Sequence, residues 1–330
     1  MAGCYTGTRV VTRYDRQICL PEVGAKGQSL LSQAAILVIG AGGLGSAVLP
    51  MLAGAGCGQI MIVDPDRVEV GNLHRQTLYR MADIGQAKAE CAARTLMDLN
   101  PDCRVQAHEA RMDPVLARQL VPQASVVVDA ADSFAVTYAL SDICLAAGVP
   151  LISASVLGRT GYVGGFCGGA PGYRAVFPDL PPHVLTCATA GVMGPVVAML
   201  GTMQAQMVLS VLLGHDPGPL GQIMSVDMAG WRVSSFRFDG APDPLASPLV
   251  VGAAELTPDD LVIELRDARE TPFLMVPGMR RLAPDKVDHL DAGGAARVVF
   301  TCASGLRAWR AAVRFSARSP MPVAILAGGA

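Results

Sequence analysis

Short apolar runs alternate with longer segments of helical periodicity through the first half of the chain. The apolar runs have the length and β-branched content of buried strands. They cover residues 35–39, 59–63, 104–108, 125–129 and 150–154. Helical segments begin near Leu44, Gln86, Pro114 and Phe134. This alternation predicts an α/β fold in which helices cover a mostly parallel sheet.

The pattern changes after residue 155. Gly-rich strands are expected around residues 161–167, a long helix from Gly191, and antiparallel strands at 222–227 and 232–238, which would extend the sheet. The stretch 192–213 is apolar and nearly long enough to span a bilayer. Lipid would leave several of its residues unsatisfied, namely Pro195, Thr202, Gln204, Gln206 and Ser210. We therefore interpret it as a buried core helix and expect no membrane span.

A segment rich in Pro, Gly and Ala at residues 239–249 predicts a linker. It separates a larger domain over residues 1–240 from a smaller one over residues 250–330, which has its own strand and helix pattern. A chain of 330 residues is long enough for two domains, since a domain takes ~150 residues.

Composition excludes several classes of protein. The chain is 51% apolar and 16% charged, so it can bury a large core. Its net charge of -2 provides no basic surface for nucleic acid. The nine cysteines are scattered and odd in number, which argues against a disulfide scaffold and for a reducing compartment. With no apolar signal segment at the N-terminus, the expected location is the cytoplasm.

A glycine-rich loop follows the first predicted strand. Gly40, Gly42 and Gly45 form the pattern G-x-G-x-x-G between a strand and a helix. Glycines permit a tight turn, and the free N–H groups of the helix N-terminus bind phosphate. Nineteen residues past Gly45, the second strand ends in Asp64, placed to bind a ribose hydroxyl. These features predict a nucleotide site.

The residues that follow indicate ATP rather than a dinucleotide redox cofactor. A nicotinamide or flavin ring calls for apolar surface, whereas a triphosphate calls for charged and amide donors. Such donors occur at Asn72, Arg75, Gln76 and Lys88. Asp132 adds a carboxylate where the fourth strand ends, at the sheet edge where a magnesium ligand belongs. An NAD(P)-dependent oxidoreductase is the alternative that these charges disfavour.

Each of these residues also has a simpler interpretation. Arg75 and Lys88 could be solvated surface charges, and Asn72 a helix cap. Asp132 could be the N-cap of the helix that begins near Phe134. The set as a whole favours the nucleotide.

The chain resembles the ThiF/MoeB/HesA family, the prokaryotic relatives of ubiquitin-activating E1 enzymes, over about residues 9–240. The matching segments follow the family order: Arg13-Tyr14-Asp15-Arg16-Gln17, Gly40 to Gly45, Asp64-Pro-Asp66, Asn72-Leu73-His74-Arg75-Gln76, Gly85-Gln-Ala-Lys88, Asp129-Ala-Ala-Asp132, and Thr186 to Pro195. Two positions depart from the family pattern. Gly71 stands where Ser is usual, and Ser133 where Asn is usual.

The resemblance implies a Rossmann-like E1 fold and a homodimeric adenylyltransferase that uses ATP and Mg²⁺. The implied substrate is a ubiquitin-like sulfur-carrier protein ending in Gly-Gly. Carried over by motif, the residues around ATP would be Gly40, Gly42, Gly43, Gly45, Asp64, Asp66, Asn72, Arg75, Gln76, Lys88, Asp132 and Ser133. Asp132 would be the Mg²⁺ ligand, and Arg16 would reach phosphates bound by the other subunit.

Two cysteine features complete the resemblance. Cys187 corresponds to the family's acceptor cysteine, and its place before a helix favours a thiolate; the alternative is a small buried apolar residue. Most family members also hold zinc with two Cys-x-x-Cys pairs. Gly172-Tyr-Arg-Ala175 and Ala241-Pro-Asp-Pro244 stand at these positions, so we predict no zinc and expect packing to hold this region together.

The C-terminal segment predicts a strand, a Cys302-x4-Arg307 loop and a helix. Backbone N–H groups and an arginine in such a loop stabilise a thiolate or persulfide. The segment looks like a truncated rhodanese domain, with further resemblance at residues 261–266, 276–278 and 325–329. It would pass sulfur from thiosulfate or a cysteine desulfurase to the carrier. Two alternatives stay open: an inert docking domain, or a nucleotide-binding protein that lacks catalysis.

Overall fold

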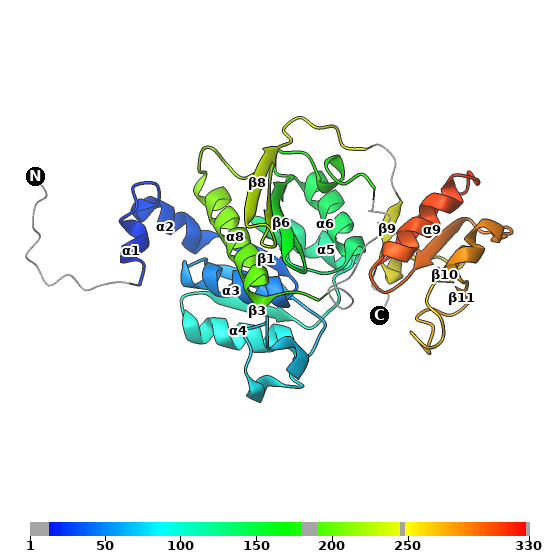
Figure 1. Cartoon of the computed structure of the whole chain (residues 1–330), viewed down its shortest axis with the longest axis horizontal. Coiled ribbons are helices and arrows are strands. Elements are labelled where there is room, and N and C mark those ends of the chain that lie inside the picture. Colours follow the sequence, from blue (N-terminus) through cyan, green and yellow to red (C-terminus); the bar gives the residue numbers. More distant parts are fainter. Residues whose placement is uncertain (1–12, 180–190, 245–247, 328–330) are drawn as a thin grey trace, which may run out of the picture.

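A computed structural model describes residues 13–179, 191–244 and 248–327. Within this part of the chain there are two β-sheets, one of eight strands and one of five. The smaller sheet and its helix lie beside the larger domain, next to α5 and α6 (Figure 1).

The larger sheet has the strand order β3-β2-β1-β4-β5-β6-β7-β8. Its strands are β1 (Ala35–Ile39), β2 (Gln59–Val63), β3 (Arg104–His108), β4 (Val126–Asp129), β5 (Leu151–Leu157), β6 (Thr160–Phe166), β7 (Gln222–Asp227) and β8 (Arg232–Arg237). Strands β1 to β5 pair in parallel, and β6 to β8 extend the sheet antiparallel. The predicted α/β fold, with a mostly parallel sheet extended by antiparallel strands, is confirmed.

Helices cover both faces of this sheet because successive side chains of each strand point to opposite faces. Ile36 and Val38 of β1 join one core cluster, and Leu37 and Ile39 join the other. The helices are α1 (Asp15–Ile18), α2 (Gly24–Gln33), α3 (Gly43–Gly54), α4 (Lys88–Leu99), α5 (Pro114–Leu120), α6 (Phe134–Ala147) and α8 (Gly194–Leu213). The first cluster includes residues of α3, α4 and α8, and the second includes residues of α5 and α6.

Among the described residues, α8 is the one helix long and apolar enough to cross a membrane. In this fold it packs against α3, β5 and β6. The approach to α3 is close, because a Cβ atom on Gly201 would lie 2.6 Å from the carbonyl oxygen of Leu44. The helix begins at Gly194 rather than at Gly191 as expected, because residues 191–193 pair with Gly158. The Gly158 N–H donates to the carbonyl oxygen of Gly191 at 3.0 Å, and the Met193 N–H donates to that of Gly158 at 3.1 Å.

The smaller sheet is entirely parallel, in the order β11-β10-β12-β13-β9. Its strands are β9 (Leu249–Val251), β10 (Asp260–Glu264), β11 (Arg280–Arg281), β12 (Arg297–Thr301) and β13 (Val323–Leu326). Helix α9 (Leu306–Ser316) follows β12 and buries Trp309 and Phe315. The chain passes from β8 to β9 within the segment that the sequence identifies as a linker.

The two sheets share one hydrophobic core. A single cluster of buried residues includes Tyr138 of α6 together with Val250, Ile263, Phe300 and Trp309 of the smaller domain. The segment before β9 also makes contacts of its own, since Ala241 packs against this cluster. The two domains therefore form one packed unit, which the composition of the linker did not indicate.

Candidate functional site

The carboxyl edge of the larger sheet brings three loops together. Strand β1 pairs with β2 on one side and β4 on the other, and the helices that follow β1 and β4 lie on opposite faces of the sheet. Open α/β sheets form a crevice at such a point. The approach is tight, because a Cβ atom on Gly40 would lie 2.6 Å from the carbonyl oxygen of Ala130. This crevice is where open α/β sheets bind ligands.

The glycines of the first loop meet backbone or packed side chains. Gly40 has φ +94°, a conformation that favours glycine. A Cβ atom on Gly45 would lie 2.2 Å from the carbonyl oxygen of Gly40, and one on Gly43 would lie 2.7 Å from Val197. The loop therefore runs directly into the first turn of α3, whose free N–H groups can bind an anion.

Asp64 and Tyr79 hold the glycine loop in place. The buried carboxylate of Asp64 accepts hydrogen bonds from the N–H groups of Ala41 at 2.7 Å and Asp66 at 2.8 Å. Burial raises its pKa. The Tyr79 hydroxyl donates to the carbonyl oxygen of Ala41 at 2.6 Å. The sequence indicated a ribose contact for Asp64, and the structure shows that this side chain also anchors the glycine loop. Tyr79 has a similar anchoring role and belongs to no sequence motif.

Lys88 is buried at the same edge. Only 6% of its side chain is exposed, and its Nζ lies 2.8 Å from Oδ2 of Asp66, whose side chain is 60% exposed. The alternative that Lys88 is a solvated surface charge is therefore wrong. The pair places one ammonium and one carboxylate beside the glycine loop.

Asn72, Arg75 and Gln76 occupy the turn after β2. Oδ1 of Asn72 accepts from the N–H of Glu69 at 3.2 Å, so it caps this short turn as the simpler interpretation held. Arg75 donates to the carbonyl oxygen of Gly71 at 3.1 Å. Its aliphatic carbons would lie within 3.8 Å of a Cβ atom on Gly43, so the side chain covers the glycine loop.

Gln76 provides a test of whether a nucleotide fits. Its side chain is buried, and Oε1 has no hydrogen-bond partner among the described residues. Its Nε2 would lie 3.8 Å from a Cβ atom on Gly42. An unpaired buried amide oxygen is costly. A hydroxyl or amino group of a nucleotide on the glycine loop would satisfy it, so these residues fit the predicted ligand.

A small cavity adjoins this loop. Its volume is about 270 Å³. The lining residues are Ala47, His74, Arg75, Thr77, Gly194, Pro195 and Ala198. It therefore links the turn after β2 to the first turn of α8.

Asp129 organises the loop after β4. Its Oδ2 accepts from the hydroxyls of Thr137 and Ser153, both at 2.8 Å, and Oδ1 accepts from the N–H of Ala131 at 3.2 Å. Nε2 of Gln204 donates to its carbonyl oxygen at 2.8 Å. Burial raises the pKa of this carboxyl to about 6. The loop that leads to Asp132 is thus fixed at its base.

Asp132 itself is exposed, and none of the described residues is shown to hydrogen-bond to its carboxylate. The N-cap of α6 is Ser133, whose side chain makes no capping bond. The interpretation of Asp132 as the helix N-cap is therefore wrong. Its carboxylate is available to a ligand at the crevice.

The metal expectations can be compared with the residues present. The described residues contain no cluster of three His, Cys, Asp or Glu able to hold a metal ion. A lone exposed Asp132 fits a Mg²⁺ ion that arrives with nucleotide phosphates, since Mg²⁺ needs only one or two carboxylates there. At the expected zinc positions, the Gly172 N–H instead donates to both carboxylate oxygens of Asp243 at 3.2 Å. A backbone N–H and one carboxylate do not provide the four ligands of a structural zinc site.

Arg16 lies far from the glycine loop of its own chain. It is exposed on α1, which packs at the C-terminal end of α3, where a Cβ atom on Gly56 would meet the Tyr14 ring at 2.6 Å. The glycine loop is at the other end of α3, ~18 Å away at 1.5 Å per residue. The structure thus does not bring Arg16 to the site within one chain. Cys187 lies outside the described residues.

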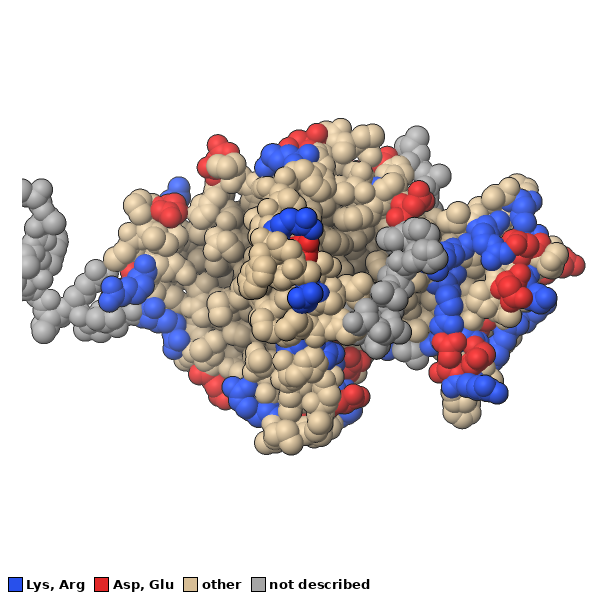
Figure 2. Space-filling view, viewed as in Figure 1, with Lys and Arg blue, Asp and Glu red and all other residues tan. Residues whose placement is uncertain are grey.

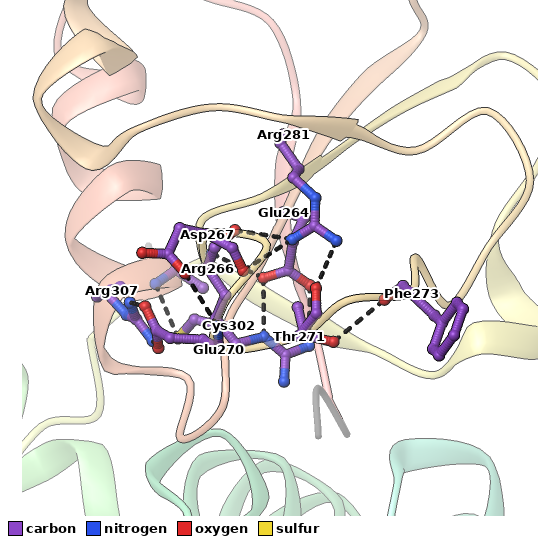
Figure 3. A network of polar contacts seen from close by, with 10 residues as sticks. Glu264, Arg266, Asp267, Glu270, Thr271, Phe273, Arg281, Cys302 and Arg307 are labelled. Carbon is purple, nitrogen blue, oxygen red and sulfur yellow. Dashed lines mark hydrogen bonds and ion pairs between the residues drawn. The ribbon is translucent and has the colours of Figure 1, made fainter.

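Cys302 lies where β12 ends. It is 2% exposed, and the N–H of Ala308 in the first turn of α9 donates to its Sγ at 3.4 Å. Arg307 forms a bidentate ion pair with Glu270, at 2.7 and 2.6 Å, which raises the pKa of the guanidinium (Figure 3). Sequence reasoning missed Glu270, because it is distant in sequence and belongs to no motif.

The loop that carries Glu270 is itself fixed by buried charges. Glu264 and Arg266 form an ion pair at 2.8 Å with both side chains buried. Arg281 donates to the carbonyl oxygens of Arg266 at 3.1 Å and Asp267 at 3.0 Å (Figure 3). The position of Glu270 beside Arg307 therefore follows from the packing of this domain.

The loop after β12 (residues 302–305, the Cys302 loop) contacts the loop after β4 (residues 130–133, the Asp132 loop). The Ser133 hydroxyl donates to the carbonyl oxygen of Ser304 at 3.5 Å. A Cβ atom on Gly305, which has φ +84°, would lie 2.6 Å from the Cβ of Ala135 in α6. The two predicted sites, treated separately from sequence, are thus neighbours.

The fold and the crevice define a doubly wound α/β protein of the class that holds a nucleotide at the carboxyl edge of its sheet. The model of the ThiF family matches residues 14–246, and the chain belongs to this family. The resemblance seen in the sequence motifs is confirmed.

Curated relatives differ in how much of their length the chain matches. The chain is 38% identical over 231 residues to "Adenylyltransferase and sulfurtransferase MOCS3" of Drosophila grimshawi, covering 69% of this chain and 51% of the relative. It is 40% identical over 223 residues to "Sulfur carrier protein adenylyltransferase" of Thermus thermophilus, covering 65% and 82%. It is 36% identical over 233 residues to "SAMP-activating enzyme E1" of Haloferax volcanii, covering 70% and 86%. The chain thus spans about half the length of the MOCS3 relative.

Solved structures of E. coli MccB share the fold. The complex with ATP has a TM-score of 0.62 at 23% identity, covering 73% of this chain and 75% of that one. The complex with MccA-N7isoASN has a TM-score of 0.63 at 24% identity, covering 72% and 74%. At this identity the likeness concerns the fold alone.

The glycine loop yields the first prediction. Gly45→Ala places a methyl group against the carbonyl oxygen of Gly40, so the loop must shift and we expect at least a tenfold weaker ATP affinity by isothermal titration calorimetry. Gly54→Ala is the control, because Gly54 lies in the same helix and a Cβ atom there would have no atom of another segment within 4 Å. Alanine there should leave ATP binding unchanged. Wild-type affinity in a folded Gly45→Ala chain would contradict the assignment.

Asp129 yields a pH prediction. Burial raises its pKa to about 6 in the fold, from an ordinary value of 3.8 for an aspartate carboxyl. The protonated carboxyl therefore contributes stability that is fully present below pH 4 and lost as the pH rises through 6, by about 3 kcal/mol in total. Asn at this position cannot ionise. Thermal melts of the Asp129→Asn chain between pH 4 and 7 should lack this decline; equal declines in both chains would refute the assignment.

Proposed function

We propose that the chain is an adenylyltransferase that uses ATP to activate the C-terminal carboxylate of a ubiquitin-like sulfur-carrier protein ending in Gly-Gly. One observation carries the proposal. The glycine loop, the buried Lys88 beside Asp66, and the exposed Asp132 share one edge of the sheet in a chain of the ThiF family. This set combines a phosphate loop with charges of both signs.

The names of relatives support the substrate class. The Thermus thermophilus relative is named a sulfur carrier protein adenylyltransferase, and the Haloferax volcanii relative a SAMP-activating E1. Both match over most of their own length. A carrier protein is therefore a better supported substrate than a free small molecule.

In the proposed reaction, a carboxylate oxygen of the carrier attacks the α-phosphorus of ATP. The bond from this phosphorus to the oxygen bridging to the β-phosphate breaks, and pyrophosphate leaves with the electron pair. Like charges oppose this attack, so cations near the phosphates lower the barrier. Arg75 and Lys88 supply such cations, and Mg²⁺ bound by Asp132 would neutralise further phosphate charge.

The C-terminal domain would supply sulfur. Its parallel sheet places Cys302 between β12 and α9, with an N–H donor on the thiol sulfur. Attack of the Cys302 thiolate on the outer sulfur of thiosulfate would release sulfite and leave a persulfide. The terminal persulfide sulfur would then attack the acyl carbon of the carrier adenylate and release AMP. Alternatively, a cysteine desulfurase would transfer the terminal sulfur of its own cysteine persulfide to the Cys302 thiolate, which forms the same Cys302 persulfide.

Release of the product then needs a second thiol. Cys187 would attack Sγ of Cys302 in the acyl disulfide, so that the carrier leaves as a thiocarboxylate. The two cysteines would remain as a disulfide, which a dithiol reductant returns to thiols. A reducing compartment would supply such a reductant.

We propose a homodimer for a geometric reason. Arg16 lies at the far end of α3 from the glycine loop of its own chain, so only a second copy could bring an Arg16 to the phosphates. The face over α3 and α8 carries few charged side chains in Figure 2, as an interface between copies requires.

Asp132→Ala tests the adenylation step. Loss of the carboxylate should reduce ATP–pyrophosphate exchange at least a hundredfold with a panel of ubiquitin-like carriers ending in Gly-Gly, while the melting temperature stays unchanged because the side chain is exposed. Asp179→Ala, another exposed carboxylate, is the control. Wild-type exchange in Asp132→Ala would remove its role. Failure of the wild-type chain to catalyse exchange with any carrier would favour a nucleotide-binding protein without catalysis.

Cys302→Ala tests the sulfur step. Transfer of sulfur from thiosulfate to the carrier should be abolished, because no persulfide can form, whereas ATP–pyrophosphate exchange should keep its wild-type rate. Mass spectrometry of the carrier detects the thiocarboxylate. Cys103→Ala, which removes a buried thiol of the larger domain, is the matched control. Undiminished transfer by Cys302→Ala would make the C-terminal domain inert in sulfur transfer.

A further inference from the structure

An aromatic pair joins the two domains. Trp309 in α9 is 3% exposed, and its ring lies against that of Tyr138 in α6, with centroids 4.5 Å apart. Figure 1 shows α9 beside the larger domain, on the side of α6. This contact belongs to the core that the two domains share.

Arg174, from a third segment of the chain, contacts both aromatic rings. It lies in the short turn Tyr173–Ala175 and is 6% exposed. Its guanidinium lies 4.6 Å from the centroid of Tyr138 and 5.1 Å from that of Trp309. Its Nε and Nη2 donate to the two carboxylate oxygens of Asp142 at 2.7 and 2.8 Å. A planar guanidinium can stack and bind a carboxylate at the same time, which an ammonium cannot.

The Arg174 segment is tied to the chain just before β9. The N–H of Gly172 donates to Asp243, which precedes the smaller domain in sequence. Arg118 of α5 also forms an ion pair with Glu255, near β9. The smaller domain is therefore held at its first strand and at its only described α-helix, α9.

These contacts determine where the Cys302 loop lies. Trp309 is in the first turns of α9, directly after the loop that Cys302 begins. When its ring rests on Tyr138, Gly305 meets Ala135 and Ser304 meets Ser133, at the start of α6. The loop thus faces the turn that carries Asp132. A rotation of α9 away from Tyr138 would break these contacts.

We propose that Arg174 is a positioning residue for sulfur transfer: with Tyr138 and Trp309 it holds the Cys302 loop at the Asp132 edge, so that Cys302 acts on an adenylate formed in the same chain. The step it serves rests on the proposed function. The docking of the smaller domain by Arg174 does not depend on the proposed function.

Fluorescence tests the docking without any carrier. In a full-length Trp231→Phe chain, Trp309 is the remaining tryptophan, because the chain has two and Trp231 is the other, 84% exposed. Arg174→Met keeps the length of the side chain and leaves Asp142 with a side chain 40% exposed to water. We expect acrylamide to quench Trp309 at least threefold more efficiently in this variant. Arg318→Lys is the control, because Arg318 stacks on Phe315 within the smaller domain.

Activity tests the positioning. Arg174→Met and Trp309→Leu should lower carrier thiocarboxylate formation at least tenfold, since misplacing a reacting group by ~1 Å can cost 10²-fold. ATP–pyrophosphate exchange, including its KM for the carrier, and thiosulfate-to-cyanide transfer should stay at wild-type rates. Trp309→Phe keeps an aromatic face and should restore coupled transfer.

Each result has one meaning. Quenching of Trp309 that does not change in Arg174→Met overturns the docking role. Increased quenching with wild-type thiocarboxylate formation overturns the positioning role. If the wild-type chain shows no exchange with any carrier, the proposed function fails by itself, and the quenching result still decides whether Arg174 fixes the smaller domain.

Discussion

The pairing of β1 with β2 on one side and β4 on the other is the constraint on which the rest of the structure depends. It opens the crevice at the carboxyl edge and directs the N-terminal turns of α3 and α6 toward it. The glycine loop leads into the first turn of α3, and the loop that carries Asp132 leads into the first turn of α6. Because the smaller domain docks on the same turn of α6, this single strand order also sets the location of Cys302.

Local patterns made much of the larger domain predictable. Apolar runs marked the inner parallel strands β1, β2, β4 and β5 to within a few residues, because strands covered on both faces are continuously apolar. The edge strand β3 is partly exposed and lacks this pattern. The glycine loop was predictable because its backbone approaches other atoms too closely for a side chain, as Gly45 shows. Both signals lie within a few consecutive residues. The start of α8 was misplaced, because residues 191–193 pair with Gly158, a contact distant in sequence that no local pattern shows.

Partners distant in sequence could not be predicted. Lys88 could not be distinguished from a surface charge until its burial against Asp66 was known. Tyr79 and Glu270 hold site residues from outside every motif. The sequence showed that the zinc ligands are absent from residues 172–175 and 241–244. It did not show which contacts join these two segments. The Gly172 N–H reaches Asp243, and the neighbouring Arg174 turns toward the smaller domain.

The shared core has a consequence for how such a protein could be rearranged by evolution or by design. Fused domains that meet only through a tether can be separated or exchanged with little harm. Here, removal of the segment after residue 248 would uncover Tyr138 and the apolar surface of α6 around it. A foreign domain in its place would have to reproduce the aromatic face of Trp309 to cover that surface. The two halves are therefore expected to be inherited, and to diverge, together.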